Sequence, residues 1–141
     1  MSQENVELIE SVYELIPLGI HTTPHQVDRL FDEHHLDQGF ELHLPADYPE
    51  GEPVFRGREG MSQFIAMLQD TWRDWRFEPQ QFLDAGERVV VVGRILAEGG
   101  ASGVPIELET AHVWTIPGGQ ATSMDVYRNR SDALEAAGLK E

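Results

Sequence analysis

The stretch FEPQQFLDAGERVVVVGRILAE, residues 77–98, decides the fold, because hydrophobic residues stop recurring at helical spacing here and begin to alternate. A DAGE turn divides the stretch into two apolar segments, and two more segments follow after EGGASG and PGG turns. The sequence therefore predicts a four-strand antiparallel meander, and Ser131 is expected to cap a short helix behind it. The four predicted strands are 77–83, 88–98, 104–116 and 120–128.

The residues before the meander predict three helices and a short hairpin. Apolar residues recur at three- and four-residue spacing in 3–16, in a segment from Thr23 to a stop at Gly39, and in a segment from Gly57 through Trp75. After the stop at Gly39, FELHL and VF are typical of short strands on either side of the proline-rich loop PADYPEGEP. Helices gathered on one face of an antiparallel sheet make an α+β domain.

Composition excludes several classes of function. The 141 residues carry a formal net charge of −15, which repels nucleic-acid backbones and anionic membrane surfaces. The chain has no cysteine, so disulfides, thiol nucleophiles and thiolate metal sites are excluded. No apolar run approaches the ~18 residues that span a bilayer, and the acidic N-terminus is unlike a signal peptide. We expect residues 1–141 to form a single cytoplasmic domain that binds neither nucleic acid nor membrane.

Several short motifs occur in a family-specific order. They are SVYE in the first helix, FELHLP, VFRGREG before the third helix, AHVWT ahead of a glycine turn, and SMDVY on the last strand. In this order and spacing the chain resembles the SnoaL-like proteins of the nuclear transport factor 2-like superfamily, which includes ketosteroid isomerase. The resemblance implies a cone-shaped curved antiparallel sheet, three helices closing an apolar pocket, and a homodimer formed through the sheet. Members include isomerases, cyclases, epoxide hydrolases and binding proteins, so fold alone does not assign the activity.

Three residues are candidates for acid–base catalysis. By its place in the first helix, Tyr13 matches the oxyanion-donating tyrosine of ketosteroid isomerase, and the base of that enzyme maps near Leu42 or His43. Its protonated aspartic acid maps to Ala111, so a close copy of steroid isomerisation is not expected. Asp125, the lone carboxylate of SMDVY, resembles the last-strand aspartate of some SnoaL-like cyclases, and burial would raise its pKa.

Each catalytic candidate has a structural alternative. Tyr13 lies on an apolar stripe and would equally suit a core tyrosine whose hydroxyl finds a partner. Strand alternation turns His43 away from any pocket that its strand neighbours line. Asp125 would equally suit a solvent-facing carboxylate or one paired with Arg94 or Arg128.

Apolar and aromatic residues are expected to form the wall of the pocket. His112 alternates with apolar neighbours on one strand face, which suits either a pocket residue or a buried, hydrogen-bonded histidine. The predicted binding residues are Phe31, Leu42, Phe55, Trp75, Arg94, His112, Trp114 and Met124.

The histidines do not predict a metal site. Adjacent His34 and His35 point about 100° apart on a helix, and Pro24 interrupts the helical spacing of His21 and His25. No nucleotide-binding glycine motif is present, and no cofactor is expected.

Two classes of function remain open. The leading hypothesis is a protein that binds a hydrophobic small molecule, acting as an isomerase, cyclase or hydrolase by cofactor-independent proton transfer on a cyclic substrate. The alternative is a non-catalytic ligand-binding or dimerisation module. Convergence of Tyr13, His43 and Asp125 around one apolar cavity would favour the enzyme.

Overall fold

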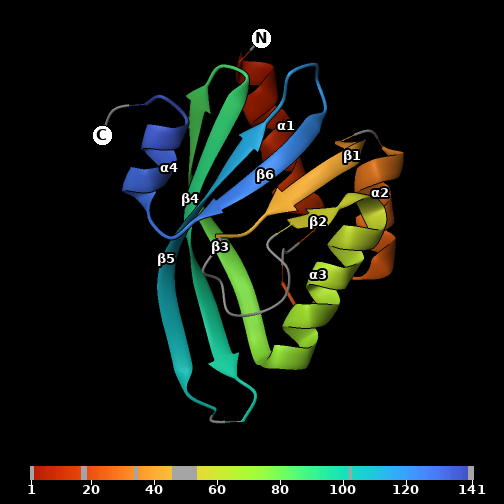
Figure 1. Cartoon of the computed structure of the whole chain (residues 1–141), viewed down its shortest axis with the longest axis vertical. Helices are drawn as coiled ribbons and strands as arrows, with labels where there is room; N and C mark the ends of the chain where they lie inside the picture. The colour runs from red at the N-terminus through yellow and green to blue at the C-terminus, as the bar shows by residue number, and fades with distance from the viewer. Residues whose placement is uncertain (1, 17–18, 34, 46–53, 102, 140–141) are drawn as a thin grey trace.

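The computed structural model shows one curved six-strand sheet with helices on both faces (Figure 1). It describes all residues except 1, 17–18, 34, 46–53, 102 and 140–141. The predicted proline-rich loop PADYPEGEP spans 45–53, and all of it except Pro45 lies outside the described residues. The elements in chain order are α1 (Ser2–Leu15), α2 (Pro24–Asp32), β1 (Leu36–His43), β2 (Val54–Arg56), α3 (Gly57–Thr71), β3 (Trp72–Ala85), β4 (Arg88–Gly99), β5 (Pro105–Thr115), β6 (Ala121–Tyr127) and α4 (Arg130–Ala136).

The sheet has the order β2-β1-β6-β5-β4-β3, so the last strand of the chain lies in its middle. The predicted meander is confirmed, because β3 to β6 pair in sequence and antiparallel. The prediction of a wholly antiparallel sheet is wrong at one place, since β1 and β6 run parallel. Parallel strands need a long crossover, and here β1 and β6 are joined through α3 and the other strands.

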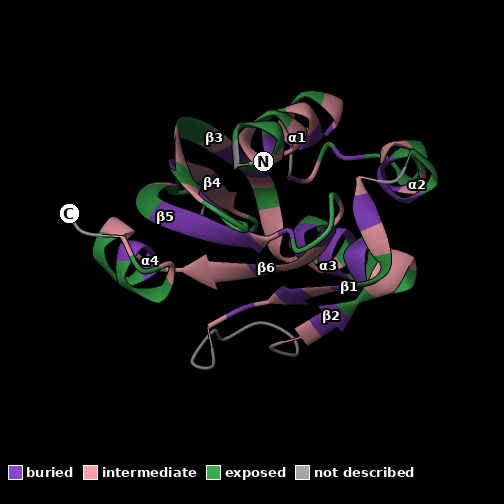
Figure 2. Cartoon of the chain, turned by 90° about the horizontal axis from the view of Figure 1, so that it is seen from above, coloured by how far each residue is buried: buried purple, intermediate pink, exposed green. Residues whose placement is uncertain are grey.

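Most of the hydrophobic core lies on the concave face of the sheet, beneath α1, α2 and α3. Ile9 and Val12 of α1 pack there with Val89 and Val91 of β4. Valines that alternate with these along β4 point to the other face, where α4 covers them with Leu134 and its neighbours. Figure 2 shows α1 and α4 on opposite sides of the strands, with buried residues in β5 and on the inner faces of the helices.

Local chemistry explains where the helices begin. Thr23 and Gln26 form a capping box at the start of α2, with each side chain accepting a hydrogen bond from the other residue's backbone N–H. Asn129, rather than the predicted Ser131, caps α4, because its side-chain oxygen accepts from the backbone N–H of Asp132.

Two predicted boundaries differ from the structure. The second helix ends at Asp32 instead of Gly39, which lies in an irregular part of β1. The third helix ends at Thr71, so Trp75 belongs to β3, where it and Phe77 alternate with exposed or half-buried residues. Aromatic residues three positions apart fit a helix, so their spacing did not reveal that the strand had already begun before Trp75.

Candidate functional site

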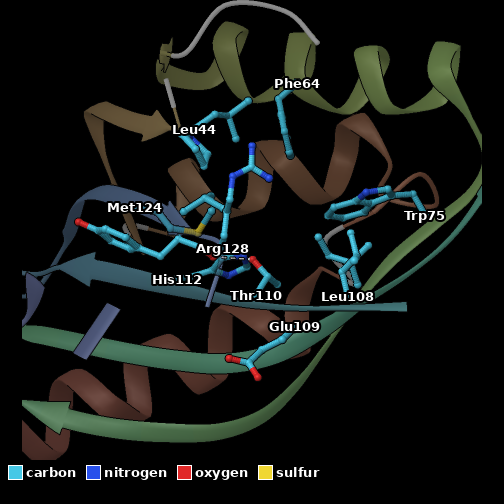
Figure 3. A pocket seen from close by; sticks show the side chains of 13 residues that line it. Leu44, Phe64, Trp75, Leu108, Glu109, Thr110, His112, Met124 and Arg128 are labelled. Carbon is cyan, nitrogen blue, oxygen red and sulfur yellow. Dashed lines mark hydrogen bonds between the residues drawn. The ribbon is translucent and has the colours of Figure 1, made fainter. Parts of the chain in front are cut away.

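A cavity of about 200 Å³ opens on the concave face between the sheet and α3 (Figure 3). Residues of β5 and β6 form its floor, α3 contributes Phe64, and Leu44 lies directly after the end of β1. Apolar side chains dominate the lining, as is usual for small-molecule sites. The lining residues are Leu44, Pro45, Phe64, Trp75, Ile95, Leu108, Glu109, Thr110, His112, Met124, Val126, Tyr127 and Arg128.

His112 is the buried imidazole of this cavity, with 3% of the residue exposed. The ring of Phe77 packs against it at 4.3 Å between centroids. Burial lowers the pKa of His112 to about 3, because a charged imidazolium would lose its hydration here. The ring is therefore neutral at physiological pH.

Tyr13 of α1 contacts the Nδ1 edge of the His112 ring and is not itself part of the cavity lining. The Tyr13 hydroxyl oxygen lies 2.7 Å from His112 Nδ1 and accepts a hydrogen bond from Trp114 Nε1 at 3.0 Å. Since the buried Tyr13 O–H needs an acceptor, and His112 Nδ1 is the acceptor that the described contacts give it, we assign the Tyr13 O–H as the donor to Nδ1. A neutral imidazole that accepts at Nδ1 carries its proton on Nε2. Burial also raises the pKa of Tyr13, which keeps the donating hydroxyl protonated.

His43 and Asp125 lie together, but on the opposite face of the sheet from the cavity. In the parallel β1–β6 register, Leu42 faces Met124 while His43 faces Asp125. Met124 lines the cavity, so its neighbour Asp125 points the other way. The predicted alternation that turns His43 outward is confirmed by the burial of Leu42 and the 35% exposure of the His43 side chain.

On that outer face, His43 bridges two carboxylates. Its Nδ1 contacts Asp125 Oδ1, and its Nε2 lies 2.9 Å from Glu41 Oε1. The other carboxylate oxygen of Glu41, Oε2, accepts a hydrogen bond from Arg56 Nε. The carboxylates bind opposite edges of the imidazole, so their oxygens do not converge on one point. Among the described residues, no three histidine, aspartate or glutamate side chains form a group that could hold a metal ion.

Comparison with known proteins assigns the family. The model of the SnoaL-like domain matches residues 23–124. The chain belongs to the SnoaL-like family. No curated protein matches this SnoaL-like chain in sequence. The helices among its described residues are too short or too polar to cross a membrane.

Solved structures share the fold at low sequence identity. TerC, co-crystallised with polyporic acid, has a TM-score of 0.71 and 22% identity over 96% of this chain and 98% of TerC. An NTF2-like protein of unknown function from Burkholderia pseudomallei has a TM-score of 0.70 and 20% identity over 94% of this chain and 95% of its own. A protein with a ketosteroid isomerase-like fold from Catenulispora acidiphila, in complex with trimethylamine, has a TM-score of 0.63 and 19% identity over 86% of each chain.

In this SnoaL-like chain only part of the predicted wall lines the cavity. Trp75, His112 and Met124 do so. Arg94 points to the outer face, where it pairs with Glu78 and Glu107. Four predicted wall residues pack in the core instead, because side chains of α1, α2 and α3 fill the rest of the concave face; they are Phe31, Leu42, Phe55 and Trp114.

Most of the cavity lining lies outside the set of residues predicted from the sequence. Once His112 is placed inward, alternation along β5 also turns Leu108 and Thr110 inward, so this signal was available. Val126 needed the β5–β6 register, in which it pairs with His112. Arg128 follows the end of β6, and strand alternation carries no information there.

Proposed function

We propose that this SnoaL-like protein binds a compact hydrophobic molecule whose carbonyl or similar oxygen accepts a hydrogen bond from His112 Nε2–H. The observation that carries the proposal is the neutral His112, held by Tyr13 in one tautomer at the wall of an apolar cavity. Tyr13 engages Nδ1 from outside the cavity lining, so the Nε2 edge is the one available to a ligand. Thr110, another polar lining residue, already donates its hydroxyl to the Tyr127 carbonyl.

The size of the cavity supports a small ligand. An apolar cavity of about 150 Å³ is enough to bind benzene, whereas drug-sized ligands occupy pockets of about 300–1,000 Å³. The cavity of about 200 Å³ suits one substituted ring.

A neutral imidazole N–H in an apolar site can polarise a bound carbonyl, since its dipole is not screened by water. Proton transfer would also need a base close to the same substrate. Among the described lining residues Glu109 is the one carboxylate; its Oε1 accepts the Arg130 backbone N–H at 2.7 Å, and its side chain points away from the cavity (Figure 3). The separate positions of Tyr13, His43 and Asp125 do not support their predicted joint role in catalysis. Binding with carbonyl polarisation is therefore the function that the geometry supports best.

The first experiment compares acetophenone with ethylbenzene, which differ by the carbonyl oxygen, as ligands of the wild type and of His112→Leu. A neutral hydrogen bond is worth about 0.5–1.5 kcal/mol, so we expect the wild type to prefer acetophenone and His112→Leu to lose about 2- to 10-fold of that preference. Titration calorimetry measures both affinities, and polyporic acid, the ligand of the TerC crystals, belongs in the same panel.

His43→Gln is the matched control, because it alters a histidine on the opposite face of the sheet. It should keep the preference of the wild type. Equal weakening of both ligands by His112→Leu would show that His112 only shapes the cavity, and would overturn the proposal.

A second experiment asks whether the protein turns over a bound ketone. Enolisation exchanges the methyl protons of acetophenone for deuterium in D₂O, which proton NMR follows directly. Since the described lining offers no base directed into the cavity, we expect exchange at the rate of the buffer alone. Accelerated exchange that His112→Leu abolishes would instead establish an enzyme, and its dependence on Asp125→Asn would test the predicted role of that residue.

A further inference from the structure

Leu108 connects the cavity to the surface of the protein. The alternate β5 residues His112, Thr110 and Leu108 all line the cavity, and their exposed fractions are 3%, 3% and 55%. In Figure 3 the three side chains follow one another in this order along the floor of the cavity. The imidazole that we assign to the ligand oxygen therefore lies at the closed end of this row, and Leu108 lies at its open end.

Apolar side chains accompany Leu108 at the open end. Leu108 pairs with Ile95 in the β4–β5 register, and both residues line the cavity together with Trp75. The charged residues of the described lining are directed elsewhere, since Glu109 points away from the cavity and Arg128 extends toward α3 (Figure 3). The path out of the cavity past Leu108 is therefore apolar.

This position gives the exposure of Leu108 a meaning that exposure alone does not have. Among the described residues, Leu108 and Val104 are the large hydrophobic side chains that are exposed. A single apolar side chain on a surface needs no explanation. An apolar side chain that continues the lining of an apolar cavity, however, extends the surface that a bound molecule can cover.

We propose that the natural ligand is an elongated hydrophobic carbonyl compound, with an apolar substituent opposite the carbonyl that covers Leu108. The inference rests on the proposed function, because the hydrogen bond to His112 fixes which end of the ligand enters the cavity. His112 and Leu108 are four residues apart on one strand, or about 13 Å, so a single ring held at His112 leaves Leu108 uncovered. A substituent that covers Leu108 removes apolar surface of both partners from water.

The experiment uses 4-propylacetophenone and 4-(methoxymethyl)acetophenone, whose substituents are similar in shape but differ by an ether oxygen in place of one methylene. Titration calorimetry gives the affinity of each compound for the wild type, Leu108→Ser, Leu108→Met and Val104→Ser. Placing an unpaired oxygen against an apolar surface is unfavourable, so we expect the wild type to bind the propyl compound about 3- to 10-fold more tightly. Leu108→Ser should lower this affinity ratio by about 3-fold or more.

Val104→Ser is the matched control, because Val104 is 56% exposed but precedes β5 and is not among the described residues that line the cavity. It should leave the affinity ratio unchanged. Leu108→Met keeps an apolar side chain of similar size, so it should retain the preference for the propyl compound.

The outcomes separate this inference from the function on which it rests. An unchanged ratio in Leu108→Ser, with acetophenone still preferred to ethylbenzene, would overturn the elongated ligand and leave the proposed function standing. Equal weakening of both substituted ketones would show that Leu108 only shapes the cavity, and would also overturn the inference. A wild-type dimer in sedimentation that Leu108→Ser dissociates would assign Leu108 to a contact with a second copy of the chain, again against the inference. Failure of acetophenone and both substituted ketones to bind the wild type would contradict both proposals.

Discussion

At the scale of single residues, His112 and His43 lie in opposite electrostatic settings. His112 is enclosed by Tyr13 and Phe77 and stays neutral, with its pKa lowered by burial. For His43, partial desolvation lowers the pKa, but the hydrogen bonds and charges of Glu41 and Asp125 outweigh it and raise the pKa overall. The two histidines should therefore affect the pH dependence of stability with opposite signs.

His112 should make the wild type lose stability as the pH falls. The unfolded chain binds a proton near pH 6.5, whereas the folded chain resists protonation of His112 down to about pH 3. Between these values the His112 contribution to the free energy of unfolding falls by about 1.4 kcal/mol for each pH unit. Urea denaturation at pH 7, 6 and 5 should show a steeper loss for the wild type than for His112→Leu. Parallel curves would contradict the buried, neutral assignment.

His43 serves as the control of opposite sign. A raised pKa stabilises the folded state fully below the unfolded value, and that contribution is lost as the pH rises through the folded value. The stability difference between the wild type and His43→Gln should therefore grow as the pH falls toward 6.5 from above the folded pKa of His43, and should stay level at lower pH.

At the scale of the elements, the approach of β4 to β3 depends on Gly93. Gly93 lies opposite Pro79, next to a register shift in β3. A Cβ atom added at Gly93 would lie 2.2 Å from the Glu78 carbonyl oxygen and 2.7 Å from the ring of Phe77. Because Phe77 packs on His112, this close approach also positions the imidazole of the cavity.

We expect Gly93→Ala to destabilise the protein by about 1–3 kcal/mol, the usual cost of overpacking a close contact. Gly118→Ala is the matched control, because an added Cβ there meets nothing within 4 Å. The control should change stability by less than about 0.5 kcal/mol. Urea denaturation measures both, and equal effects would show that the Gly93 contact relaxes without cost.

The elements also show how far the sequence could predict the site. Period-two alternation was sufficient to turn His43 outward and to place His112 on an apolar face, because each depends on its own strand. The pairing of Tyr13 with His112 depends on how α1 docks across the sheet, which no local pattern contains. For the same reason, four aromatic or aliphatic residues predicted as pocket wall, such as Trp114, proved to be core.

At the scale of the whole molecule, the sheet presents two unequal faces. α1, α2 and α3 cover the concave face and leave the cavity, while α4 covers part of the other face over β4 and β5. In Figure 1 the β4–β5 hairpin extends beyond the helices, and Val104 and Leu108 of this region are more than half exposed. The homodimer through the sheet stays a prediction, and a partner would have to dock beside α4.

The central position of β6 has a consequence for synthesis and folding. During translation, β1 and β5 emerge first, and each has an unpaired edge until residues 121–127 are made and inserted between them. Exposed edges are templates for aggregation, and pairing across about 80 residues is slow because the intervening chain must first be ordered. Met124, Val126 and Arg128 arrive with the same strand or just after it. The nascent chain should therefore acquire its cavity and cover the open edges of β1 and β5 in a single late step.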